Sequence, residues 1–170
     1  AYPELGKRDL LKETIAACKP RNIRVTPYIS TGHKLAYSMI ANDYPEYARR
    51  KRPNAPPERQ QMFLGEDHAT VCWMSPYREA YWDYVKHVVR DYSIDGLYFD
   101  TWRPFYFWKG TKICYCDSCQ KGFLEYSGKK LPYHKNEQNY TAREWQVIRE
   151  YQQWYREDCI RFFHNLRDMI

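Results

Sequence analysis

The order of helical and strand patterns constrains the fold of this chain more than any other feature. Apolar residues recur at helical spacing over residues 9–18, over residues 76–92 and after residue 141. Two short runs of strand-forming residues, 23–30 and 97–100, lie between them. The chain therefore repeats the order helix, strand, long connection twice, and a last helix follows. Such alternation is typical of a parallel sheet with right-handed crossovers.

The lengths of the connections narrow this prediction. The segments that lead into the strands, 19–22 and 93–95, are short, whereas those that follow the strands are long. This asymmetry fits a (β/α)8 barrel, in which the functional loops gather at one face. A complete barrel needs roughly 250 residues, and only two strands are apparent. We therefore predict the α/β class and a single domain over residues 1–170: a partial TIM barrel with parallel strands and long βα loops.

Capping residues mark the ends of the predicted helices. Asp9 is a suitable N-cap for the first helix. Ser75 followed by Pro76 predicts the start of the second, with Ser75 as N-cap and Pro76 at the first helical position. Thr141 and Glu144 have the spacing of a capping box, which predicts the start of the last helix.

Charge and hydropathy restrict the classes of partner. The net charge of +6 would suit nucleic acid. However, the one dense basic cluster, residues 49–52, lies in a proline-rich stretch, for which we predict a solvated loop. Nucleic acid is therefore not the expected partner. No apolar run approaches the length of a membrane span, so we expect no membrane contact. The chain shows no signal-peptide pattern, and it supports no prediction between a cytoplasmic and a secreted location.

Asp100 is the first candidate for chemistry. It ends the apolar run 97–100. A charged group is costly to place at the end of a buried strand. Catalytic groups sit at the C-terminal ends of strands in parallel α/β folds. There Asp100 could act as a nucleophile, as a general base or as an electrostatic partner of an oxocarbenium-like transition state. The structural alternative is that Asp100 caps a helix or fixes a loop. Asp95 precedes the strand and so lies at its opposite end, and we predict that it only forms a turn.

Four residues near the strand ends are predicted to bind substrate. Tyr28 lies in the first strand and His33 follows it, while Trp102 and Arg103 follow Asp100. The 17 tyrosines and 6 tryptophans of the chain suit a sugar ligand, because an aromatic face packs on the C–H face of a pyranose. The alternative for each of these side chains is packing within a loop or simple exposure to solvent.

The cysteine spacing predicts a metal site. Cys114, Cys116 and Cys119 place three soft ligands on a turn that leads into a helix. A structural zinc site needs four ligands, and Cys72 is the natural fourth because it lies in the other connection that follows a strand. The alternative is a group of buried free thiols. The other two cysteines, Cys18 and Cys159, lie on apolar helix stripes and are predicted to be core residues.

Three segments of the chain resemble the hypothetical glycosyl hydrolase 6 family of TIM-barrel hydrolases. They are the run Cys-Trp-Met-Ser-Pro-Tyr-Arg at 72–78, the run Asp-Gly-Leu-Tyr-Phe-Asp at 95–100 and the run Cys-Tyr-Cys-Asp-Ser-Cys at 114–119. The upstream segments 9–11 and 23–30 also match this family. The resemblance covers most of residues 6–127. It implies a glycoside hydrolase that cleaves O-glycosidic bonds of a carbohydrate.

Two further families resemble parts of this pattern. The cysteine order is similar to that of family 42 β-galactosidases, which implies that Cys72, Cys114, Cys116 and Cys119 bind a structural zinc ion. Those enzymes have an Asn-Glu pair at the end of the corresponding strand, where this chain has only Asp100. In this respect it is similar to the family 29 fucosidases, and that similarity implies a retaining mechanism with Asp100 as the nucleophile.

A retaining mechanism leaves one question open, because it needs a second carboxyl group about 5–5.5 Å from the first. Glu66 and Asp67 are candidates. In such barrels, however, the partner often comes from a later strand, so we expect the remaining barrel units of a longer parent chain, or an oligomer, to complete the site. The alternatives are a carbohydrate-binding barrel fragment without catalysis, and a zinc-stabilised module that binds nucleic acid or protein through residues 49–52.

Overall fold

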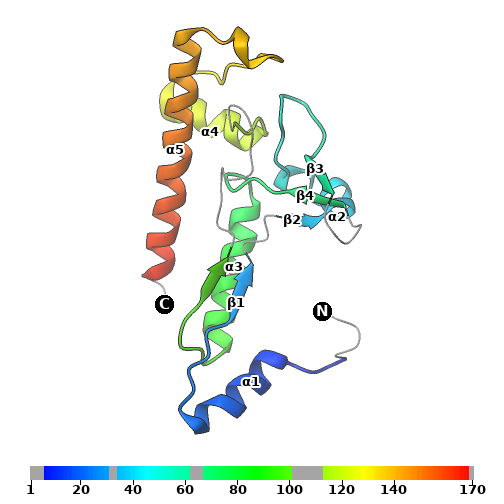
Figure 1. Cartoon of the computed structure of the whole chain (residues 1–170), viewed down its shortest axis with the longest axis vertical. Helices are drawn as coiled ribbons and strands as arrows, with labels where there is room; N and C mark the ends of the chain where they lie inside the picture. The colour runs from blue at the N-terminus through cyan, green and yellow to red at the C-terminus, as the bar shows by residue number, and fades with distance from the viewer. Residues whose placement is uncertain (1–5, 31–33, 62–66, 101–112, 169–170) are drawn as a thin grey trace.

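The computed structural model describes residues 6–30, 34–61, 67–100 and 113–168, which form a mixed α/β structure (Figure 1). The helices are α1 (Leu10–Cys18), α2 (Tyr37–Asn42), α3 (Tyr77–Asp91), α4 (Asp117–Ser127) and α5 (Ala142–Arg167). The strands are β1 (Tyr28–Ser30), β2 (Lys34–Ala36), β3 (Arg59–Gln61), β4 (Asp67–Thr70) and β5 (Tyr98–Asp100). Single 3₁₀ turns, Lys19–Arg21, Pro45–Tyr47 and Glu137–Asn139, lie between them.

The two predicted strands pair in parallel, as the alternation of elements indicated. β1 and β5 form a two-stranded sheet in which Tyr28 is opposite Tyr98 and Ser30 is opposite Asp100. The first strand is shorter than predicted because the Asp95 side chain replaces a strand partner. Its Oδ2 accepts the Val25 N–H at 2.7 Å, while the Asp95 N–H donates to the Val25 carbonyl at 2.9 Å. This arrangement confirms a structural role for Asp95.

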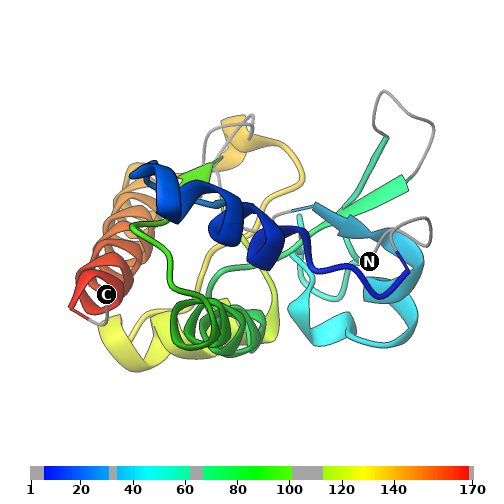
Figure 2. The same cartoon turned by 90° about the horizontal axis from the view of Figure 1, so that it is seen from below.

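The connection between β1 and α3 contains a second sheet that the sequence did not predict. Its antiparallel order is β2-β4-β3, with Ala69 of β4 opposite Leu35 on one side and Arg59 on the other. Strands of three or four residues are too short for their alternation to be recognised in a sequence. Seen from below, this sheet and α5 lie on opposite sides of the molecule (Figure 2).

The packing of α3 against α5 forms one part of the core. Trp73, which precedes α3, packs edge-on against Phe162 of α5 with ring centroids 4.7 Å apart, and Trp82 of α3 meets the same ring at 5.1 Å. Arg78 of α3 and Asp158 of α5 form an ion pair of 2.5 Å. Of the buried side chains in these two helices, the predicted stripes supply all but Tyr151: Tyr77, Tyr81, Val85 and Val88 in α3, and Ile148, Tyr155, Cys159, Phe162 and Leu166 in α5.

The capping predictions for α1 and α5 are confirmed. Asp9 accepts the Lys12 N–H at 3.0 Å, and Thr141 and Glu144 form the predicted capping box of α5. Helix α3 begins one residue later than predicted, at Tyr77, with Pro76 in the N-cap position, while the hydroxyl oxygen of Ser75 accepts the Tyr77 N–H at 3.3 Å.

The two cysteines predicted to be core residues differ. Cys159 is buried in α5, as expected. Cys18 is only half-buried, and none of the nine residues of α1, all of them described, is buried. That prediction is wrong because α1 lies at the end of the molecule, where the described part of the chain gives its apolar stripe little cover (Figure 1). Within the described residues, no helix combines the length and apolar character needed to span a membrane.

Candidate metal centre and candidate catalytic strand

Four cysteines far apart in the sequence meet in one buried cluster, as predicted. The cysteine cluster consists of Cys72, from the connection between β4 and α3, and Cys114, Cys116 and Cys119 at the start of α4. Their sulfur atoms all lie within 4.8 Å of one another, and the Cys72 and Cys119 sulfurs are 3.4 Å apart.

The sulfur distances distinguish a metal site from disulfides. A disulfide needs about 2.05 Å between sulfurs, and all four cysteines are free thiols. Four thiolates around a tetrahedral ion with metal–sulfur bonds of about 2.3 Å would lie about 3.8 Å apart. The cluster is close to that arrangement, so it could hold a metal ion. Four soft, buried sulfur donors with no open position suit structural zinc.

Backbone hydrogen bonds hold the cysteine-bearing segments in place. The Cys72 N–H donates to the Tyr47 carbonyl at 2.8 Å, and the Tyr115 N–H donates to the Arg50 carbonyl at 2.9 Å. Both acceptors belong to the segment that precedes β3. This segment therefore fixes the distance between Cys72 and the other three cysteines.

The pKa values of the cluster thiols are shifted in opposite directions. Burial raises the pKa values of the Cys72 and Cys119 thiols well above their ordinary values, and hydrogen bonds that both make to Cys114 and Cys116 add to this effect. Burial also acts to raise the pKa of Cys114, but hydrogen bonds from Cys116, Cys119 and Cys72, with the charge of Arg49, bring it well below its ordinary value. In the metal-free protein Cys114 is therefore the preferred thiolate, and a metal ion must displace protons from Cys72 and Cys119.

Two tyrosines of α5 contact this centre, and sequence analysis missed one of them. The Tyr151 hydroxyl accepts the Cys114 N–H at 3.2 Å and donates to the Cys119 sulfur at 3.3 Å. One helical turn later, the Tyr155 hydroxyl accepts the Trp73 N–H at 3.2 Å. Tyr155 belongs to the predicted apolar stripe. Tyr151 could have been added to it, because it is three residues after Ile148 and four before Tyr155.

The basic segment 49–52 is the solvated loop predicted from its composition only at Lys51 and Arg52, which are exposed. Arg49 is buried; it forms an ion pair with Glu58 at 2.7 Å and donates to the Ile113 carbonyl at 3.3 Å. Arg50 donates to the carbonyls of Pro45, at 3.2 Å, and Ala55. For Arg49 and Arg50 the prediction is wrong, because backbone carbonyls and the buried Glu58 carboxylate accept hydrogen bonds from their guanidinium groups. A run of basic residues shows none of these partners.

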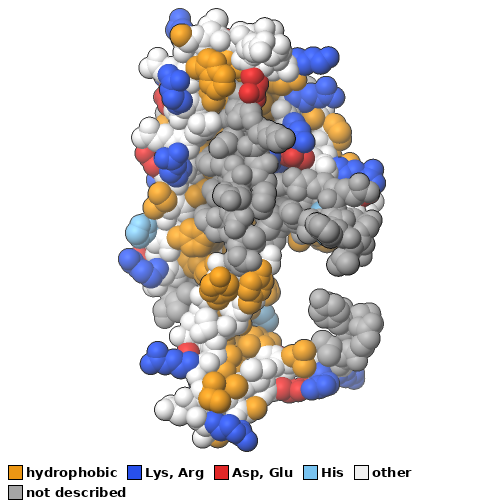
Figure 3. Space-filling model, viewed as in Figure 1, with side chains coloured by type: hydrophobic (Ala, Val, Ile, Leu, Met, Phe, Trp, Pro, Cys, Tyr) orange, Lys and Arg blue, Asp and Glu red, His pale blue; other side chains and the backbone are white. Residues whose placement is uncertain are grey.

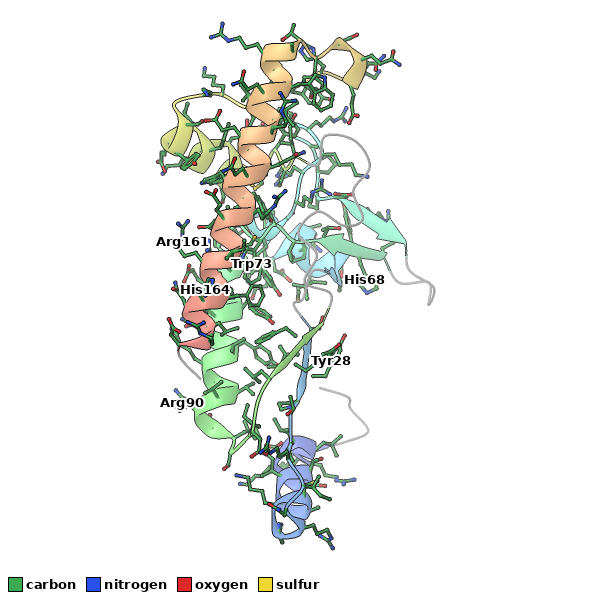
Figure 4. All side chains as sticks on the ribbon, turned by 60° about the vertical axis from the view of Figure 1, so that its left-hand side comes forward. Tyr28, His68, Trp73, Arg90, Arg161 and His164 are labelled. Atoms are coloured by element: carbon green, nitrogen blue, oxygen red, sulfur yellow. The ribbon has the colours of Figure 1, made fainter. Side chains whose placement is uncertain are left out.

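The strand that ends at Asp100 has one covered and one open face. Phe99 packs against Phe163 of α5, with ring centroids 5.9 Å apart. On the other face Tyr28 and Tyr98 are 59% and 57% exposed, and their rings are 5.9 Å apart. Tyr28 projects away from α3 and α5 (Figure 4), and hydrophobic side chains gather over this region in the space-filling view (Figure 3).

A cavity of about 360 Å³ lies beside β1, close to the end of the strand that pairs with Asp100. Ser30 and the aromatic residues of α3 and of the connection before β3 contribute to its walls. Its tyrosines are Tyr44, Tyr47, Tyr77, Tyr81 and Tyr84. A concave surface with several tyrosines is the kind of site that accommodates a sugar ring.

The structure brings together only some of the predicted site residues. Tyr28 and the backbone of Asp100 lie on adjacent strands. His33, Trp102, Arg103 and Glu66 lie outside the described residues. Asp67, the other candidate for the second carboxyl, forms an ion pair with Arg59 across the antiparallel sheet. His68 lies on that same sheet, apart from Tyr28 (Figure 4).

A family model described as "Hypothetical glycosyl hydrolase 6" matches residues 2–101, more than half of the chain. The chain belongs to this family. The match confirms the resemblance seen in the sequence, and it ends one residue after Asp100. Cys72 lies within the matched range, while the other three members of the cysteine cluster follow it.

Among solved structures, the chain is similar to alpha-L-fucosidase isoenzyme 2 from Paenibacillus thiaminolyticus. The two share 24% sequence identity with a TM-score of 0.57. The similarity covers 95% of this chain and 21% of the fucosidase, so the chain spans about a fifth of that protein. At this identity the likeness is one of fold. No curated protein matches the sequence.

Proposed function

We propose that this glycosyl hydrolase family domain contributes Asp100 as the nucleophile of a retaining glycoside hydrolase. One observation carries the proposal: in a chain of this family, Asp100 ends β5, which pairs in parallel with β1. In parallel α/β enzymes, the strand ends on that side carry the reacting groups. The fold likeness to a fucosidase makes an α-L-fucoside the first substrate to test.

In the proposed reaction the Asp100 carboxylate attacks the anomeric carbon and forms a glycosyl ester while the glycosidic C–O bond breaks. A second carboxylic acid gives its proton to the leaving oxygen and then, as a carboxylate, removes a proton from the water that hydrolyses the ester. Asp67 is a poor candidate for this second group because Arg59 already binds it. We assign the role to a carboxylate of further β/α units.

Those further units would complete a TIM barrel around β1 and β5. A two-stranded parallel sheet is marginal in isolation, and parallel sheets are normally covered on both faces. The exposed Tyr28 and Tyr98 are what the inner face of an open barrel would present. The missing units would belong to a longer parent chain or to another subunit. Within the barrel, Tyr28, His33, Trp102 and Arg103 are the proposed sugar-binding residues.

We further propose that the metal of the cysteine cluster is zinc with a structural role. All four donors are buried thiols, so a bound ion would have no open position for water or substrate. Cys72, Cys114, Cys116 and Cys119 would hold it. The ion would join the two connections that follow β1 and β5 by cross-linking them, and it would take no part in proton transfer.

The test uses the protein that contains this chain, with Asp100→Asn and the matched control Asp83→Asn on the exposed side of α3. Turnover of aryl glycosides, starting with an aryl α-L-fucoside, should fall to background in Asp100→Asn and stay unchanged in Asp83→Asn. Sugar affinity and the circular dichroism spectrum should be unchanged in both. Turnover that survives in Asp100→Asn would rule out the nucleophile. A wild-type protein that binds sugars and turns over no glycoside would favour the carbohydrate-binding alternative.

The nucleic-acid alternative depended on the basic residues 49–52, and three of them have partners within the protein. Arg49 and Arg50 are engaged within the protein, and Lys51 forms an ion pair of 3.0 Å with Glu58. Electrostatic binding to nucleic acid depends on basic groups that can release counterions from phosphates. Nucleic-acid affinity that falls steeply with salt would restore this alternative.

A further inference from the structure

Helix α5 meets the cysteine cluster through two tyrosines that occupy equivalent positions but make different contacts. Tyr151 and Tyr155 are four residues apart, on the same face of the helix. Both accept a backbone N–H from a segment that carries cluster cysteines, Tyr151 from Cys114 and Tyr155 from Trp73, next to Cys72. The Tyr151 hydroxyl also donates to a cluster sulfur, that of Cys119 at 3.3 Å.

We propose that Tyr151 is a positioning residue of the metal centre, and that a bound metal docks α5 onto the two cysteine-bearing segments through this side chain. The inference rests on the metal site proposed above. It goes beyond that site because it assigns a role to a residue that is not a ligand and to a helix that lies outside the matched family segment.

The hydrogen-bond geometry supports this role. The Tyr151 oxygen accepts the Cys114 N–H, so its proton is directed toward the Cys119 sulfur. A donor to a metal-bound thiolate offsets part of its negative charge and fixes its orientation, as other outer partners of metal ligands do.

The same helix continues to the candidate catalytic strand. Phe163 follows Tyr151 by 12 residues, about 18 Å along a helix. Its ring packs against Phe99, the neighbour of Asp100 in β5. Its neighbour Phe162 packs edge-on against Trp73. Through α5, metal at the cysteine cluster would therefore support the covered face of β5.

The first experiment compares Tyr151→Phe with the matched control Tyr155→Phe in zinc competition titrations. Both variants lose one hydroxyl and the backbone hydrogen bond that it accepts, and Tyr151→Phe also loses the 3.3 Å contact with the Cys119 sulfur. We expect about 10–100-fold weaker zinc binding for Tyr151→Phe and a smaller loss for Tyr155→Phe. In the cobalt-substituted protein the thiolate-to-cobalt absorption band should shift in Tyr151→Phe alone. Equal affinity for the wild type and Tyr151→Phe, with an unshifted band, would overturn the proposal.

The second experiment measures amide hydrogen exchange in the wild-type chain, with zinc bound and after zinc is removed by a chelator. It needs no substituted protein, so it remains informative if Tyr151→Phe fails to fold. Removal of zinc should speed exchange in α5, from about residue 148 to residue 163, and in β5. Unchanged exchange in α5 would contradict the docking role. A wild-type chain that binds no zinc would overturn the metal site together with this inference, whereas glycoside turnover is tested separately through Asp100.

Discussion

Arg49 and Glu58 form an ion pair in which both side chains are only 5% exposed, with 2.7 Å between Nη1 and Oε2. The second guanidinium nitrogen of Arg49 donates to the carbonyl of Ile113, the residue before Cys114. One buried charge therefore joins the segment before β3 to the segment that carries the cysteines. It also lies close enough to favour the thiolate form of Cys114.

Replacement of Glu58 by Gln should destabilise the protein strongly. The change keeps the shape of the side chain but leaves the Arg49 charge buried without its partner, for which the loss is about 3–5 kcal/mol in the free energy of unfolding. Urea denaturation measures it. Glu79→Gln, at an exposed position of α3, is the control and should change the free energy by less than about 0.5 kcal/mol. A Glu58→Gln variant as stable as this control would show that the pair contributes little.

Removal of a cluster ligand should remove the metal and with it part of the stability. We expect about one equivalent of zinc per wild-type chain and much less in Cys119→Ser, while Cys18→Ser, at a half-buried position in α1, keeps the metal. A loss of about 3 kcal/mol would lower the Tm of a chain of this size by about 6–12 °C, and chelation of the wild type should have a similar effect. A purified wild-type chain without zinc, with four freely titratable cluster thiols, would exclude the site.

A side chain larger than hydrogen at residue 122 should disturb the packing of α4 on α5. A Cβ atom at Gly122 would lie 3.1 Å from Cζ2 of Trp154. Trp154 is held by ring contacts on several sides, with Phe123, Tyr126, Tyr151 and Tyr155. Gly122→Val should therefore lower the free energy of unfolding by about 1–3 kcal/mol. Helix propensity alone would make Gly122→Val slightly stabilising, because valine is a better helix former than glycine. A free energy of unfolding that stays unchanged or rises would therefore show that Trp154 can move.

The start of α5 should lose stability in acid. The Thr141 N–H, followed by His134 and the Thr141 hydroxyl, holds the pKa of Glu144 at about 2, below its ordinary value of 4.5. A lowered pKa means that this stabilisation is complete above pH 4.5 and is lost as the pH falls from there through about 2. Unfolding measured against pH should show this dependence in the wild type and in Glu157→Gln, but not in Glu144→Gln. Identical pH profiles in all three would rule out this contribution.

The parts of the structure that sequence analysis predicted depend on short-range signals. The capping box of α5 needs only residues 141 and 144, and three of the four cluster cysteines lie within six residues. The pairing of β1 with β5 followed from the alternation of helices and strands, which restricts topology strongly. The roles of Asp100, His33, Trp102 and Arg103 stay predictions.

The parts that were missed depend on partners distant in the sequence. Arg49 is buried because it meets Glu58 and a carbonyl 64 residues away, and a run of basic residues carries no sign of either. Tyr151 lies on a recognisable stripe, but its contact with Cys119 appears only once α5 is folded against α4. The antiparallel sheet was missed because strands as short as β2 are defined by their pairing and not by their own residues.

The two-stranded parallel sheet has a practical consequence for work with this chain. In the described part of the protein, β1 and β5 each have a strand neighbour on one side only. Unpaired strand edges next to exposed aromatic rings act as templates on which other chains assemble. The 170-residue chain expressed alone should therefore associate with itself as its concentration rises, and a fragment that includes whatever covers Tyr28 and Tyr98 should remain dispersed.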